Sequence, residues 1–155
     1  MEDGDGTWWH FYWGTKGGKE GIPNRILCFF GVTVERYSWC VEFTGDATSL
    51  DEINEAKQYG GKYETMYYFA GDFSGIIDGL KNPSGKYNLY TNNCSQFSLE
   101  MLALADTEYS DLFSGAGNHV LPASANKYIA NNLNRYASTN MIYYEYALQE
   151  SYLEW

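Results

Sequence analysis

Residues 87–106 read YNLYTNNCSQFSLEMLALAD, and the expected fold depends on this segment more than on any other. Its second half carries apolar residues at helical spacing, namely Phe97, Met101, Leu104 and Ala105. This spacing predicts a helix that packs one face on a core. Cys94 then lies at or just before the first turn, where Asn92, Asn93 and Ser95 can cap free N–H groups.

The position predicted for Cys94 favours a nucleophilic thiol. The positive end of the helix dipole and the unpaired N–H groups favour thiolate over thiol, and they provide donors for an oxyanion. A buried structural cysteine is the alternative, because cysteine is among the most buried residue types. The polar residues on both sides of Cys94 weigh against that alternative.

The pattern Tyr-x-Leu-x-x-Asn-Asn-Cys-Ser-x-Phe over residues 87–97, followed by an apolar helix, resembles the cysteine segment of bacterial papain-like hydrolases. It is most similar to the circularly permuted group related to NlpC/P60 domains, in which a strand histidine precedes the cysteine helix. The resemblance implies that Cys94 is the nucleophile and that Asn93 contributes to the oxyanion pocket. In that group a Gly-His pair stands on a strand before the one that this chain carries at residues 7–13.

A cysteine hydrolase needs a base near the thiol, and histidine is the usual choice because its pKa lies near neutrality. The chain has two histidines. His10 precedes the cysteine, as in the permuted order, although it lies at residues 7–13, one strand later than the Gly-His pair of that group. His119 follows the cysteine in a Gly-Asn-His loop. We expect His10 to be the better candidate, and Glu35, Glu42 or Asn24 could orient the imidazole.

Composition limits the classes of partner. The chain has 155 residues, a formal net charge of −10 and an aromatic content of 18%. An acidic surface repels nucleic acid and anionic membranes, so a neutral or cationic peptide, cell-wall or protein substrate fits better. No apolar run is long enough for a membrane span, so we expect none, and we expect no signal peptide. Both a cytoplasmic location and secretion within a larger effector remain open.

The three cysteines show no spacing typical of a zinc site, and no cofactor or metal is expected. A disulfide between Cys28 and Cys40 is compatible with neighbouring strands. Free buried cysteines are the commoner outcome in a reducing compartment.

Hydrophobic periodicity predicts an α+β fold, with one antiparallel sheet of four to six strands covered by the Cys94 helix and two or three other helices. Strands are expected at 7–13, 25–30, 32–43, 62–70 and 87–90. Helices are expected at about 49–59, 72–82 and 122–136, and residues 107–120 read as a loop. Residues 1–136 are expected to form one papain-like domain, and residues 137–155 a C-terminal extension that could be helical.

These features favour a thiol hydrolase, either an amidase or peptidase or an acyl transferase, that acts on cell-wall peptide or as part of an effector or toxin. The alternative is an inactive or truncated relative that binds a glycan or a protein through its aromatic side chains.

Overall fold

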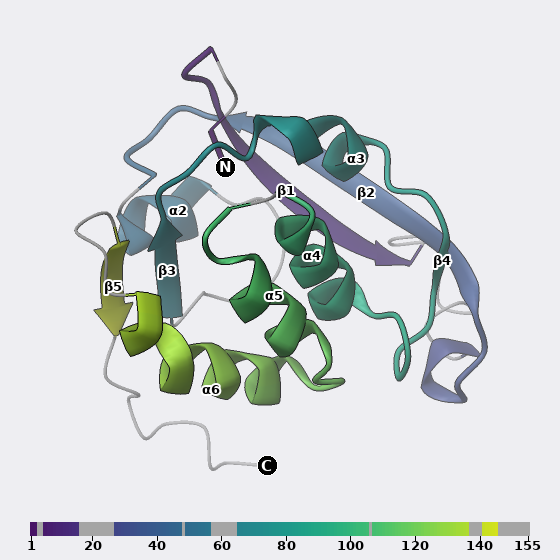
Figure 1. The fold of residues 1–155 in the computed structure, drawn as a ribbon. Coiled ribbons are helices and arrows are strands. Elements are labelled where there is room, and N and C mark those ends of the chain that lie inside the picture. Colours follow the sequence, from purple (N-terminus) through teal and green to yellow (C-terminus); the bar gives the residue numbers. More distant parts are fainter. Residues whose placement is uncertain are drawn as a thin grey trace, which may run out of the picture.

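The computed structural model describes residues 1–2, 5–15, 27–47, 49–56, 65–105, 107–136 and 141–145. These residues form β-strands and helices in a mixed order along the chain (Figure 1). The strands are β1 (Trp8–Thr15), β2 (Val34–Phe43), β3 (Thr65–Phe69), β4 (Lys86–Tyr87) and β5 (Met141–Glu145). The helices are α2 (Leu50–Ala56), α3 (Ile77–Lys81), α4 (Cys94–Ala103), α5 (Ser110–Gly117) and α6 (Pro122–Asn132), with 3₁₀ turns η2 (Ser74–Ile76) and η3 (Leu133–Tyr136).

The described strands form two antiparallel sheets, which confirms the α+β class. One sheet has the order β1-β2-β4, and the other pairs β3 with β5. The expectation of a single sheet of four to six strands is therefore wrong. The reason is that β3 takes its partner from near the far end of the chain, so it does not extend the β1-β2-β4 sheet.

Long-range packing decides the main departures from the predicted elements. Residues 110–117 form α5 instead of a loop, because Leu112, Phe113 and Ala116 share one buried helical face. The segment expected as a strand at 25–30 is helical at residues 27–29. Residues 141–145 form β5 and pair with β3, so the tail is not helical there, and residues 137–140 and 146–155 lie outside the described part.

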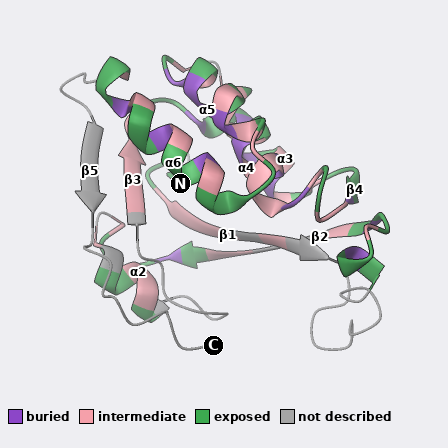
Figure 2. Ribbon diagram, turned by 90° about the horizontal axis from the view of Figure 1, so that it is seen from below, coloured by how far each residue is buried: buried purple, intermediate pink, exposed green. Residues whose placement is uncertain are grey.

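The main core lies among the helices, against one face of β1 and β2 (Figure 2). Its most deeply buried side chains are Leu80, Tyr109, Leu112 and Phe113. Helix α4 contributes Phe97 and Leu99 to this core. The predicted core position Leu104 is instead 66% exposed, because α4 ends at Ala103 and Leu104 is its C-cap.

One tryptophan fixes how α4 lies on the sheet. The indole N–H of Trp13 donates to the carbonyl of Leu80 at 3.1 Å. The same ring meets Phe97 edge to face, with 5.7 Å between ring centroids. On the neighbouring strand, the guanidinium of Arg36 lies 3.9 Å from the centre of the Phe97 ring. These contacts hold the first turns of α4, and therefore Cys94, against the sheet.

Candidate active site

Cys94 occupies the first position of α4, as the sequence predicts. Asn93 is the N-cap residue, and its side-chain oxygen accepts a hydrogen bond from the N–H of Gln96 at 3.1 Å. The side-chain oxygen of Gln96 accepts in return from the N–H of Asn93 at 3.1 Å. This reciprocal capping box fixes the start of the helix. The N–H groups of Cys94 and Ser95 belong to the first turn, whose N–H groups find no acceptor within a helix.

Asn93 has a structural role that the sequence did not reveal. Its side chain is buried, and its amide nitrogen donates to the carbonyl of Leu89 at 3.2 Å and to the carbonyl of Val120 at 2.6 Å. All the N–H groups of Asn93 are thus engaged inside the protein. The role in an oxyanion pocket that the resemblance implied therefore does not fit Asn93, and the N–H groups of Cys94 and Ser95 are better placed for it.

The side chain of Cys94 packs against a small apolar cluster formed by Cys28, Val34 and Tyr87, and it is half-buried. Burial raises the pKa of the Cys28 thiol, which keeps that residue protonated at neutral pH. All three cysteines are free. A bond between Cys28 and Cys40 is excluded by distance, since Cys40 lies six residues along β2 from Val34, or roughly 20 Å in an extended strand.

His10 is not brought to Cys94. It lies on β1 opposite Val41, whereas Cys94 packs near Val34. Val41 is seven residues along β2 from Val34, which corresponds to roughly 23 Å in an extended strand. A general base must be within hydrogen-bond reach of its proton, directly or through one water. His10 therefore cannot serve Cys94 in this arrangement.

His119 lies in the segment that the structure brings to the start of α4. Its N–H donates to the carbonyl of Ala116 at 3.0 Å, just beyond the end of α5. The next residue, Val120, is the one that accepts the hydrogen bond from Asn93. The imidazole rests beside the ring of Tyr128, with 5.2 Å between centroids. Of the two histidines, His119 is thus the one whose neighbour in the chain, Val120, is hydrogen-bonded to the residue preceding Cys94.

Neither of the described residues considered as orienting partners lies opposite His10 in the strand register. Glu35 lies opposite Lys86 across the β2–β4 pair, and Glu42 lies opposite Trp9. Asn24 lies outside the described residues.

A polar cavity of about 500 Å³ lies between α4 and α5, close to this junction. Neither Cys94 nor His119 lines it, but Asn92 and Asn118, which lie close to them in sequence, do. Two carboxylates, Glu100 and Asp111, also face it. The remaining lining residues are Thr91, Gln96, Ala103, Leu104, Ser110, Phe113, Ser114 and Gly117. Such a lining suits a ligand with many hydrogen-bonding groups and no net negative charge.

The sequence interpretation missed this junction because it treated residues 107–120 as a loop. The buried triplet Leu112, Phe113 and Ala116 has helical spacing and was the available signal. Because α5 packs on α4, the residues that follow α5, including His119, lie toward the start of α4.

Comparisons with known proteins found no match to this chain among protein-family models, curated proteins or solved structures. In the part of the chain that the structure describes, no helix combines the length and the apolar character needed to cross a membrane.

Proposed function

We propose that this protein is a thiol-dependent amidase or acyl transferase in which Cys94 is the nucleophile and His119 is the base. The observation that carries the proposal is the hydrogen bond of 2.6 Å from Asn93 to the carbonyl of Val120. It joins the turn that presents the thiol to the loop that presents the imidazole. A second support is the position of Cys94 at the first residue of a capped helix.

In the proposed reaction the imidazole of His119 takes the thiol proton, and the sulfur of Cys94 attacks an amide or ester carbonyl carbon. The N–H groups of Cys94 and Ser95 stabilise the oxyanion that forms. The carbon–nitrogen or carbon–oxygen bond then breaks, and the leaving group takes the proton from the imidazolium. Water, or an acceptor amine in a transferase, attacks the thioester and regenerates the thiol. This chemistry requires the His119 ring to turn from Tyr128 toward Cys94 when substrate binds.

The polar cavity between α4 and α5 suggests the class of substrate. Its amide and hydroxyl side chains match the hydrogen-bonding groups of a peptide backbone, and Glu100 and Asp111 disfavour an acidic ligand. A peptide substrate that is neutral or cationic is therefore expected. Cell-wall peptide and a protein target of an effector or toxin both belong to this class.

The test is the rate at which iodoacetamide alkylates Cys94 at pH 6.5, followed by peptide mapping. We expect Cys94 to react faster than an unstructured thiol peptide. His119→Ala should lower this rate at least threefold, whereas His10→Ala should change it by less than twofold. Cys40→Ala is the matched cysteine control and should leave the labelling of Cys94 as it is.

An acylation assay separates a reactive thiol from a catalytic one. With p-nitrophenyl acetate, the protein should release nitrophenolate and carry an acetyl group on Cys94 that mass spectrometry detects. Cys94→Ala should abolish both signals. If Cys94 reacts no faster than the thiol peptide, or if His119→Ala leaves the rate unchanged, the pair does not act as proposed.

A further inference from the structure

The outer edge of β1 carries backbone groups that the described sheet leaves unpaired. The sheet order places β1 at an edge, with β2 on its other side. Trp9 exchanges two hydrogen bonds with Met1, at 2.9 Å and 2.7 Å, so its backbone groups point away from β2. Because strand residues alternate, the N–H and C=O groups of Phe11 and Trp13 point to the same outer edge. No described residue pairs with them.

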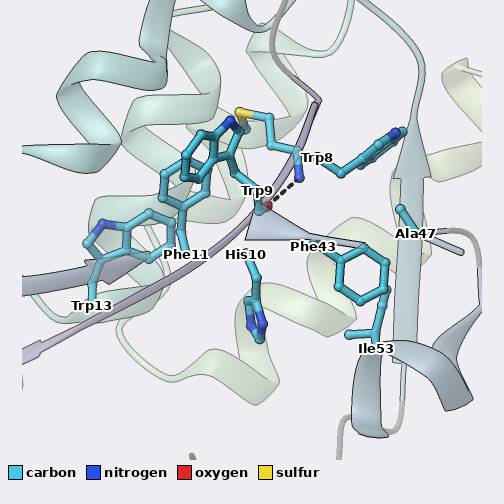
Figure 3. Close-up of a pocket in the computed structure, with 9 residues that line it drawn as sticks. Trp8, Trp9, His10, Phe11, Trp13, Phe43, Ala47 and Ile53 are labelled. Atoms are coloured by element: carbon cyan, nitrogen blue, oxygen red, sulfur yellow. Dashed lines mark hydrogen bonds between the residues drawn. The ribbon is translucent and has the colours of Figure 1, made fainter. Parts of the chain in front are cut away.

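A groove of about 270 Å³ is lined by residues from both faces of β1 and by Met1, which pairs with the outer edge. Phe43 of β2 also lines it, so the groove is not confined to that edge. Figure 3 shows Phe11 and Trp13 on one side of the strand and His10 on the other, with Phe43, Ala47 and Ile53 grouped near the Trp8 end of β1. The complete lining is Met1, Trp8, Trp9, His10, Phe11, Trp13, Phe43, Ala47 and Ile53.

The edge already accepts one short strand. Glu2 forms an antiparallel bridge with Trp8, so residues 1–2 pair with the beginning of β1, and no other described residue pairs with the rest of its outer edge. A strand that continued along this line would meet the outward groups of Phe11 and Trp13 next. Its side chains on one side would enter the apolar groove.

From these observations we propose that the outer edge of β1 binds an extended peptide segment by β-strand addition, with an apolar side chain of the peptide in the groove. Backbone hydrogen bonds to Phe11 and Trp13 supply affinity, and the groove supplies selectivity. The net charge of −10 disfavours an acidic segment, so a neutral or basic peptide is expected. This inference does not depend on Cys94, so its test is independent of the test of the thiol chemistry.

The probe is an acetylated, amidated peptide of sequence Lys-Val-Thr-Val-Thr-Val-Lys, titrated into the full chain. Amide hydrogen exchange is followed by NMR at single residues. We expect the amides of Phe11 and Trp13 to exchange fast in the free protein and at least tenfold more slowly with saturating peptide. The amide of Tyr12, which points to β2 by the same alternation, is the internal control and should be protected in both states.

Two comparisons make the result specific. The same peptide with its inner amide nitrogens methylated keeps its side chains but cannot donate along a sheet edge, and it should bind at least tenfold more weakly. Ala47→Trp fills the groove and should weaken binding of the unmethylated peptide to a similar extent. Ala123→Trp makes the same change at an exposed position of α6 outside the groove, and it should alter affinity by less than twofold.

Three outcomes would overturn the proposal. The first is the absence of binding at millimolar peptide, and the second is binding that leaves the exchange of Phe11 and Trp13 unchanged. The third is that these amides become more protected as the protein concentration rises in the absence of peptide. This result would identify the occupant as a second copy of the chain. The methylated peptide is tested on the unaltered protein, so the comparison holds even if Ala47→Trp fails to fold.

Discussion

Asn93→Ala should destabilise the protein by about 3 kcal/mol. The substitution removes the N-cap acceptor for Gln96, which is worth about 1 kcal/mol. It also leaves the carbonyls of Leu89 and Val120 without their donor in a partly buried setting, at about 1 kcal/mol each. For a domain of this size, the sum corresponds to a fall in Tm of about 6–12 °C.

The measurement is urea unfolding, followed by the fluorescence of the five tryptophans. Asn93→Asp keeps the acceptor but loses both donors, so it should cost about 2 kcal/mol or more. This variant separates the bridge to Val120 from the helix cap. Asn131→Ala, at an exposed position on α6, is the matched control and should stay within about 0.5 kcal/mol of the parent.

A loss of less than about 1 kcal/mol for Asn93→Ala, with an unchanged denaturant slope, would refute this account of the junction. It would mean that α4 and the loop with Val120 are held together by other contacts. The proposal that His119 is delivered to Cys94 through Asn93 would then lose its main support.

Three further outcomes are expected. Leu99→Ala should lower the free energy of unfolding in urea by about 2–5 kcal/mol, because Leu99 is buried. Leu104→Ala should lower it by less than about 0.5 kcal/mol, because Leu104 is mostly exposed. Equal losses of stability would contradict the observed helix end. Cys28 should resist alkylation at pH 8 until urea unfolds the protein, because burial raises the pKa of its thiol, and peptide mapping of the native protein would reveal any early labelling. Hydrogen bonds from the hydroxyl and the N–H of Ser74 lower the pKa of Asp72 below its ordinary value of 3.8. The contribution of Asp72 to stability is therefore present above that pH and is lost as the pH falls through the lower folded-state pKa. Asp72→Asn should flatten the acid limb of a stability profile measured from pH 2 to pH 6, and an unaltered limb would exclude the effect.

Local signals in the sequence identified most of the individual elements. The helical spacing of Ala125, Ile129 and Leu133 predicted a helix at 122–136 and its buried face, and the structure has α6 followed by η3 over this range. The polar residues around Cys94 predicted the start of α4 to within its first turn. Both predictions rest on signals that act within a few residues of each other.

What the sequence could not provide was the choice between partners far apart in the chain. Nothing local shows that β3 pairs with β5, or that Asn93 bonds to Val120. The same limit applies to the proposed base. His10 matched the order of the resembling family, but its place in the strand register separates it from Cys94. Register and long-range contacts depend on global packing, which periodicity does not report.

The pairing of β3 with β5 has a consequence for how the chain is made. Residues 65–69 emerge from the ribosome long before residues 141–145, which are their partners in the sheet. At typical rates of synthesis, β3 waits roughly 4–15 s before its partner has been polymerised. During this time its backbone can pair with other nascent chains. Slowing translation downstream of β3 should therefore lower the yield of folded protein, and chaperones that shield extended segments should restore it.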